Sequence, residues 1–457
     1  MKQIHLIAIF FGLNMAPYFS IYAQDTLKVM TYNVLHYGDG CQGSNTFLHS
    51  KLKTIINYSN PDILGLVKVQ AIKVTSTDNN GISPYGFADS IATFALNAAY
   101  PGKYNYCPLT NYSASNDMDV LFYNQNKLGF VSFTSLCKLS EDFDLYKLFY
   151  KDPHLNTTHD STFLYVILNH TVSGTSPTGR DQQDTVIINK LKSAFYHLPN
   201  LISMGDFNTH SSLETGYQRY TNTSDTSFLF HDAPFTPDKK LTYPLNWESN
   251  PNLCPAYLNT TTRASSSIPN SCGTSGGAKD WFIHILFSGW MLNNTDFIKY
   301  IDNSYTTIGN DGNRLGISEN DSVTSGKNNS APSNVINAIF QLSDKYPIML
   351  SVAVTYDSLG NGPVNPVNAV ATINSPLWNV RINNPVRDYM MLHFPDNLIG
   401  KKAIIRLNDI CGRCISVDKE YIINDAELQL QNKITSGIYF LTIQVEHCST
   451  VLKVIKQ

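Results

Sequence analysis

Five polar residues stand at the ends of strongly apolar segments, where they are placed to do chemistry. They are Asn33 in TYNVLHYG, His170 in LNHTVSG, Asp206 and Asn208 in MGDFN, and Asp344 in LSDKYPI. Polar residues that follow buried strands gather at one edge of a layered α/β protein, where such proteins build their sites. Carboxylate and amide oxygens suit a hard cation such as Mg²⁺. With a histidine and an asparagine for an anionic oxygen, the set would describe metal-assisted hydrolysis of a phosphate ester.

The elements that must position these residues alternate between strand and helix patterns. We expect strands over 27–35, 61–70, 161–172, 200–208, 280–288 and 346–356, and helices over 48–60, 87–100 and 180–198. A hairpin across Gln125 and Asn126 is expected to join strands at 118–124 and 127–133. This mixture of strand pairs and helices indicates a layered α+β or α/β fold.

Residues 27–356 resemble the endonuclease/exonuclease/phosphatase superfamily, which includes deoxyribonuclease-like hydrolases. The resemblance rests on TYNVLHYG, the H-x-x-x-G segment at 170–174, MGDFN, and the S-D-x-Y-P segment at 343–347. It implies an α+β fold in which two packed mixed β-sheets form a four-layer αββα sandwich. It also implies Mg²⁺ as the cofactor. The residues that the resemblance makes catalytic are His170, Asp206, Asn208 and Asp344; those that bind substrate are Asn33, His170 and Asn208; those that hold the metal are Asn33, Asp206 and Asp344.

Three positions depart from the family pattern. Lys68 in PDILGLVKVQ replaces the family's metal-binding glutamate. Ile283 in DWFIHILFS replaces an aspartate, and Lys345 replaces the histidine that hydrogen-bonds to that aspartate in the family. An ammonium beside Asp206 and Asp344 would repel a divalent cation and substitute for its charge. The plainer interpretation of Lys68 is that it lies at a strand end, with its ammonium reaching water.

Two classes of function follow. In the first, the domain is catalytically impaired and binds a phosphate-like or other anionic ligand through Lys68, Lys345, His170 and Asn208. In the second, it is an active metal-dependent phosphodiesterase, nuclease or phosphatase in which another acid replaces the lost ligand. The candidates for that substitute ligand are Asp39, Asp280 and Glu319, and each is equally well explained as a solvated loop charge.

Composition and the N-terminus indicate an exported globular protein. The chain has 457 residues, 42% of them hydrophobic and 15% charged, with a net charge of −3. No basic run is present, which argues against a large footprint for duplex nucleic acid. Residues 1–23 read as a secretory signal, with Lys2, an apolar run from Ile4 to Phe11, and Ala23 before the cut. No later segment reaches the length needed to span a membrane, and we expect a monomer.

The eight cysteines suit an exported chain, in which disulfides form. Cys254 and Cys272 flank a loop rich in Ser, Thr and Asn, and they are the first candidate pair. Cys411 and Cys414 have C-x-x-C spacing, but a zinc site would need a second pair and only Cys448 remains nearby.

The C-terminal part has a different character. We expect the first domain over 25–357, a linker rich in Gly, Pro and Asn over 358–376, and a small β-sandwich over 377–457. NNPVRDYMMLHF, TSGIYFLTIQ and the terminal VLKVIKQ resemble the C-terminal sorting domain of the type IX secretion system. The resemblance implies the type IX machinery as a partner, and a secreted or outer-surface location. A generic adhesion or carbohydrate-binding sandwich is the alternative.

Overall fold

The computed structural model divides the chain into two compact units, residues 1–365 and 366–457. In the first unit it describes residues 22–71, 86–113, 115–153, 155, 161–264, 272–294, 297–321 and 326–357. In the second it describes residues 380–382, 385–386, 389–394, 398–409, 414–425, 427–431, 434–445 and 448–456. The predicted signal at 1–23 falls almost wholly outside these residues, and so does the predicted linker at 358–376.

Two mixed sheets form the centre of the first unit. The first sheet runs in the order β11 (Ile298–Tyr300), β13 (Ile348–Asp357), β1 (Tyr22–Tyr37), β2 (Ile63–Gln70), β4 (Asp117–Asn124), β3 (Tyr104–Tyr106), with β12 (Thr306–Thr307) also paired to β13. The second runs in the order β5 (Leu128–Cys137), β6 (Phe143–Tyr150), β7 (Phe163–His170), β8 (Leu201–Asp206), β10 (Ile283–Ser288), β9 (Phe230–Asp232). Short 3₁₀ turns lie at Thr226–Phe228, Pro251–Leu253 and Gly289–Leu292.

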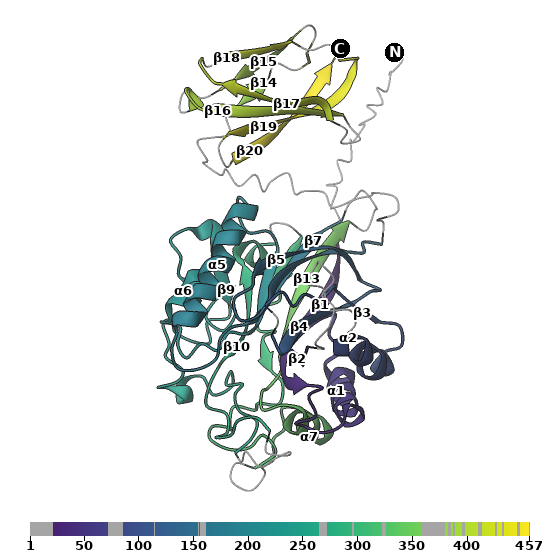
Figure 1. The fold of residues 1–457 in the computed structure, drawn as a ribbon, viewed down its shortest axis with the longest axis vertical. Coiled ribbons are helices and arrows are strands. Elements are labelled where there is room, and N and C mark those ends of the chain that lie inside the picture. Colours follow the sequence, from purple (N-terminus) through teal and green to yellow (C-terminus); the bar gives the residue numbers. More distant parts are fainter. Residues whose placement is uncertain are drawn as a thin grey trace, which may run out of the picture. The chain divides into compact units, whose positions relative to one another are not determined.

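Helices cover the outer face of each sheet, which gives four layers (Figure 1). The first sheet is covered by α1 (Asn45–Ser59), α7 (Ser333–Leu342), and a helical stretch made of α2 (Gly86–Ile91), the π-turn Ala92–Leu96 and α3 (Asn97–Ala99). The second sheet is covered by α5 (Thr178–Ala194) and α6 (Thr215–Thr221). The predicted four-layer αββα sandwich is confirmed.

The apolar strands account for the close packing of the two sheets. In β2 the first five residues are all buried, as expected for a strand covered on both faces. Gly65 in its middle lets the sheets approach, because a Cβ there would stand 2.5 Å from Leu168 Cδ2 of β7. On the outer side, Ser44 caps α1 by accepting a hydrogen bond from the Phe47 amide at 3.3 Å.

Two predictions about connections are wrong. The strands on either side of Gln125 and Asn126 do not form a hairpin: β4 pairs with β2 and β3 in the first sheet, and β5 pairs with β6 in the second. The turn therefore carries the chain from one sheet to the other. Cys272 forms a disulfide with Cys41, not with Cys254, which is a buried free thiol. Short spacing in sequence could not reveal a bridge between segments 231 residues apart.

The second unit is a small β-sandwich, as predicted. One sheet contains β14 (Arg381–Ile382), β15 (Tyr389–His393) and β18 (Glu427–Gln431). The other contains β17 (Cys414–Ile422), β16 (Lys402–Asp409), β19 (Gly437–Val445) and β20 (Cys448–Lys456). Strand β16 alternates between buried and more exposed positions, which is the pattern of a strand with one face toward a core. Within the described ranges of the whole chain, no helix has the length and apolar character to span a bilayer.

Candidate functional site

Asn33 and Asp206 join the two sheets at one edge of the sandwich. Asn33 lies on β1, Asp206 ends β8, and the Asn33 side-chain amide donates to Asp206 Oδ2 at 2.8 Å. The other oxygen, Asp206 Oδ1, accepts the Asn208 backbone amide at 3.0 Å. The Asn208 side chain in turn donates to the Thr171 carbonyl, next to His170, at 2.7 Å. The structure therefore brings together the predicted polar residues of β1, β7 and β8.

Gly205 explains how Asp206 reaches this position. Strands β7 and β8 run parallel, with His170 opposite Asp206 and Asn169 opposite Gly205. Gly205 has φ +142°, and a Cβ there would stand 1.9 Å from the Asn169 carbonyl oxygen. Only glycine permits this close approach between the two strands. The Gly-Asp step of the MGDFN segment therefore fixes the carboxylate beside the end of β7.

Asp344 and Lys345 precede β13 and form an ion pair with each other. Lys345 Nζ lies 3.3 Å from Asp344 Oδ2, and the same oxygen accepts hydrogen bonds from the backbone amide and hydroxyl of Thr274 at 2.8 and 2.7 Å. Burial alone would raise the pKa of Asp344, but Lys345 and Thr274 outweigh it and lower the pKa. Asp344 is therefore a buried carboxylate already neutralised within the chain.

Ile283 is an apolar residue at this otherwise polar edge of the sandwich. It is fully buried and lies directly opposite Asp206 across the β10–β8 pairing. Its backbone is held by Asn259, which accepts from the Ile283 amide at 3.1 Å and donates to its carbonyl at 2.8 Å. No charged side chain can act from this position. The neighbours Trp281 and His284 are buried packing residues, with His284 held by Asp232 at 2.8 Å.

Lys68 occupies an irregular point near the end of β2. Its φ is +64°, and the pairing of β2 with β4 shifts register between Leu66 and Val69. The side chain is half-buried, and it forms no ion pair with any described residue. Its charge acts on His170, whose pKa it lowers. Lys68 therefore presents an unpaired ammonium close to His170.

Two acids that the sequence analysis missed lie beside His170. Glu141 Oε2 is 2.6 Å from His170 Nδ1. The ligand-capable atoms of Asp119, Glu141 and His170 all lie within 4.8 Å of one another. Burial lowers the pKa of His170, but Glu141 and Asp119 outweigh it and leave the pKa raised. Asp119 interrupts an otherwise apolar strand, and that was the one signal in the sequence that could have pointed to it.

As they are arranged, the predicted metal-binding residues leave few oxygens without a partner for Mg²⁺. Both oxygens of Asp206 already accept hydrogen bonds, from Asn33 and Asn208. Asn33 Oδ1 accepts the Leu35 amide at 3.0 Å, and Asp344 Oδ2 is paired with Lys345. Mg²⁺ requires several free oxygen ligands, and among these three residues only Asp344 Oδ1 has no partner.

The substitute ligands considered from the sequence lie in different settings. Asp39 accepts the Cys41 amide at 2.7 Å and lies at a surface hollow. Asp280 is half-buried and flanks the bridge to Thr260. Glu319 is fully buried. Burial raises the pKa of Glu319 well above its usual range, and the charges of Arg314 and Arg263 lower it only in part.

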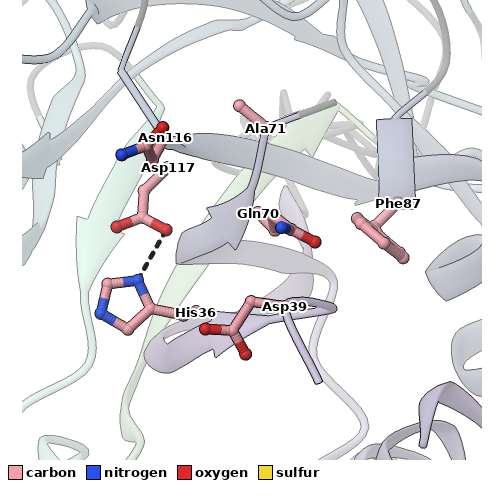
Figure 2. Close-up of a pocket in the computed structure, with 7 residues that line it drawn as sticks. All are labelled: His36, Asp39, Gln70, Ala71, Phe87, Asn116 and Asp117. Carbon is pink, nitrogen blue, oxygen red and sulfur yellow. Dashed lines mark hydrogen bonds and ion pairs between the residues drawn. The ribbon is translucent and has the colours of Figure 1, made fainter. Parts of the chain in front are cut away.

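An open hollow lies beside this edge (Figure 2), with a volume of about 660 Å³. His36 and Asp117 meet in it, with Nδ1 and Oδ1 2.8 Å apart, and Gln70 follows Lys68 along β2. Seven residues line the hollow: His36, Asp39, Gln70, Ala71, Phe87, Asn116 and Asp117. Polar and apolar side chains both line it, so it could accept a ligand that carries both kinds of group.

Comparison of the sequence with known families gives one match. Residues 384–457 match the family described as "Secretion system C-terminal sorting domain". The C-terminal unit is a sorting domain. This confirms the prediction from its terminal strands and indicates export through the type IX system to the cell surface. Comparison with curated proteins finds no match.

Solved structures similar to the chain include proteins named as members of the endonuclease/exonuclease/phosphatase family, the family predicted from the motifs. The human Nocturnin catalytic domain is 14% identical, with 72% of this chain and 97% of that chain covered and a TM-score of 0.43. A family protein from Bacteroides thetaiotaomicron is 13% identical, with 73% and 97% covered and a TM-score of 0.41. A mannosyl-6-phosphatase of the same organism is 13% identical, with 71% and 99% covered and a TM-score of 0.40.

Proposed function

We propose that residues 25–357 form an exported domain of the endonuclease/exonuclease/phosphatase type that binds a phosphate-bearing or other anionic ligand and lacks the family's Mg²⁺-dependent hydrolysis. The observation that carries the proposal is the pairing of Asp344 with Lys345, together with the unpaired ammonium of Lys68. Lys345 neutralises Asp344, the acid of the S-D-x-Y-P segment at 343–347. The other lysine, Lys68, stands where the family has its metal-binding glutamate.

The remaining polar groups support an anion at this edge. His170 is held at Nδ1 by Glu141, which leaves Nε2 for a ligand. Its raised pKa favours the protonated ring, a donor to phosphate oxygens. Lys68 adds a second positive charge from β2 of the facing sheet. Hydrolysis has no equivalent support, because Ile283 and Lys345 remove both partners of the family's aspartate–histidine pair.

An active hydrolase with a substitute metal ligand is the second candidate. The grouping of Asp119, Glu141 and His170 favours it, because two carboxylates and an imidazole can ligate a divalent cation. In that case the reaction would use a metal displaced from the family position.

Binding and turnover, measured side by side, test the proposal. Inorganic phosphate binding is measured by calorimetry for the natural protein, Lys68→Met and Lys299→Met. Lys299 is an exposed lysine of β11 and serves as the matched control. We expect Lys68→Met to weaken binding by about tenfold or more, because a charge-assisted hydrogen bond contributes roughly 1.5–3 kcal/mol. Equal affinity in all three proteins would refute the anion site.

Hydrolysis of plasmid DNA and of a bis-aryl phosphodiester is assayed with Mg²⁺ and with Mn²⁺. We expect no turnover by the natural protein. Metal-dependent turnover that disappears in Asp206→Ala would instead establish the second candidate. The triple variant Lys68→Glu, Ile283→Asp, Lys345→His restores the family pattern, and turnover by it alone would show that these three substitutions removed the chemistry.

A further inference from the structure

A small enclosed cavity lies where β4 of the first sheet faces β6 and β7 of the second. Its volume is about 10 Å³, which leaves room for roughly one water molecule or one ion. Five carboxylates line it, from residues Asp117, Asp119, Glu141, Asp142 and Asp144. The predicted metal-binding residues Asn33, Asp206 and Asp344 do not line this cavity.

Three carboxylate oxygens in this cavity are inaccessible to solvent and have no partner among the described residues. They are both oxygens of Asp119, and Oδ1 of Asp144. Asp144 is 4% exposed, and its other oxygen accepts the Thr110 hydroxyl at 2.6 Å. Buried carboxylate oxygens without donors are rare, since each carries a large desolvation penalty. They therefore indicate an absent electropositive partner.

His170, which lies beside Glu141 and whose charge acts on Asp119, is the positive group that the described residues bring to this cluster. Glu141 is paired with His170, Asp117 with His36, and Asp142 accepts the backbone amides of Tyr112 and Ser113. No described lysine or arginine forms an ion pair with any of the five acids. Protonation of Asp119 would remove one charge, but it would leave the other carboxylates of the cavity without a cation. A cation satisfies the charge and the empty lone pairs together.

We propose that Asp119 and Glu141 bind one divalent cation of the oxygen-preferring class, such as Mn²⁺ or Ca²⁺, in this cavity, which Asp144 also lines. The ligand-capable atoms of Asp119, Glu141 and His170 lie within 4.8 Å of one another. Two oxygens on opposite sides of such a cation stand about 4.2–5 Å apart, so the spacing suits one shared ion.

The cation would act on the anion-binding edge through Glu141. Glu141 would ligate the ion and also hold His170 Nδ1, the arrangement in which a carboxylate orients an imidazole. His170 Nε2 would then remain directed toward the ligand near Lys68. This site goes beyond the proposed anion binding, which does not require it.

Mn²⁺ alone is the first probe, with the full chain freed of metal by EDTA and dialysis. Binding is followed by calorimetry and by loss of the free Mn²⁺ signal in electron paramagnetic resonance. We expect one Mn²⁺ per chain and a rise in the unfolding temperature on binding. Ca²⁺ should compete for the same site. Absence of saturable binding would overturn the proposal.

Three isosteric variants locate the ion. Asp119→Asn should weaken Mn²⁺ binding by about tenfold or more and abolish the rise in unfolding temperature. Asp302→Asn, at an exposed aspartate, controls for the loss of one charge, and Asp344→Asn tests the family metal position. Both should bind Mn²⁺ like the natural protein. Weakened binding in Asp344→Asn with unchanged binding in Asp119→Asn would place the ion at the family position and overturn this proposal.

A fold control accompanies Asp119→Asn. In EDTA this variant should unfold at a temperature equal to or above that of the natural protein, because it removes a buried acid without a partner. A lower unfolding temperature in EDTA would mean that Asp119 is a structural residue, and would also count against the site. Phosphate binding and hydrolysis are measured in separate experiments. The Mn²⁺ result therefore still tests the cation site if the proposed anion binding fails.

Discussion

At the scale of single residues, Lys345 and Lys68 differ in the partners of their ammonium groups. Lys345 is 8% exposed and forms an ion pair with Asp344, whereas Lys68 has no ion-pair partner among the described residues. The same residue type therefore serves two purposes. The buried pair of Asp344 and Lys345 holds the segment before β13 in place, and the unpaired ammonium of Lys68 remains available to a ligand.

Asp184 allows a residue-scale prediction about pH. It is fully buried on α5, and a Cβ at Gly216 of α6 would stand 2.2 Å from its Oδ2. Burial raises the pKa of Asp184 to about 8. The unfolded chain, with an ordinary carboxyl pKa of about 3.9, loses this proton first. The folded state therefore binds more protons between about pH 4 and 8, and the free energy of unfolding falls as pH rises by up to about 1.4 kcal/mol per unit.

Asp184→Asn should remove this contribution. The variant's advantage in stability should be smaller at pH 5 than at pH 8, because the unfolded natural chain ionises above about pH 4 while folded Asp184 keeps its proton until about pH 8. At pH 8 the variant should be more stable by about 2 kcal/mol or more. Urea denaturation of both proteins at each pH tests this prediction. If the difference in their free energies of unfolding does not grow with pH, Asp184 is ionised in the folded protein.

The sequence predicted the residues of the family pattern but not those that only the fold brings together. Asn33 and Asp206 stand in recognisable segments, and they meet at 2.8 Å as the resemblance implied. Asp119 and Glu141 stand in no such segment. Asp119 reaches His170 because β4 packs against the second sheet, and Glu141 reaches it from the connection between β5 and β6. Neither contact has a local signature.

At the scale of elements, the approach of β7 and β8 depends on Gly205. Gly205→Ala would place a Cβ against the backbone oxygen of Asn169, an atom that cannot rotate away. We expect a loss of about 3 kcal/mol or more in the free energy of unfolding, together with displacement of Asp206. Gly179→Ala is the control, because a Cβ at this position in α5 meets Val172 at an ordinary 3.5 Å. Chemical denaturation of both variants would contradict the prediction if they behaved alike.

The elements themselves were predictable, and one connection was not. The helix at 48–60 and the strands at 61–70 and 200–208 have strong apolar periodicity, and the structure contains α1, β2 and β8 there. The turn at Gln125 and Asn126 resembles a hairpin locally. Its flanking strands instead find partners in different sheets, because burying the apolar faces of β4 and β5 between the layers outweighs local pairing.

At the scale of the whole molecule, the disulfide between Cys41 and Cys272 closes a very long loop, with a sequence separation of 231. In the chain-entropy account, such a crosslink stabilises the fold by about 5 kcal/mol. The double variant Cys41→Ser, Cys272→Ser should therefore unfold at a lower temperature than the natural protein. Dithiothreitol should lower the unfolding temperature of the natural protein toward that of the variant. Equal unfolding temperatures without reductant would contradict this.

Each unit of the chain has a hydrophobic core of its own. The described core residues of the first unit lie between Leu27 and Val354, and those of the second lie between Val380 and Val454. No described residue belongs to both sets. A sorting domain that serves export does not have to stabilise the protein that it carries, so the first unit should fold without the second.

A chain ending at residue 357 tests this independence. We expect its unfolding temperature to match the corresponding transition of the full chain within about 2 °C, because all of its core and the disulfide are retained. Its affinities for phosphate and Mn²⁺ should be unchanged. In a host with a type IX system, the shortened protein should no longer reach the cell surface, whereas the full chain should. Loss of folding in the shortened chain would show that the second unit stabilises the first, and normal export would show that residues 384–457 are not the sorting signal.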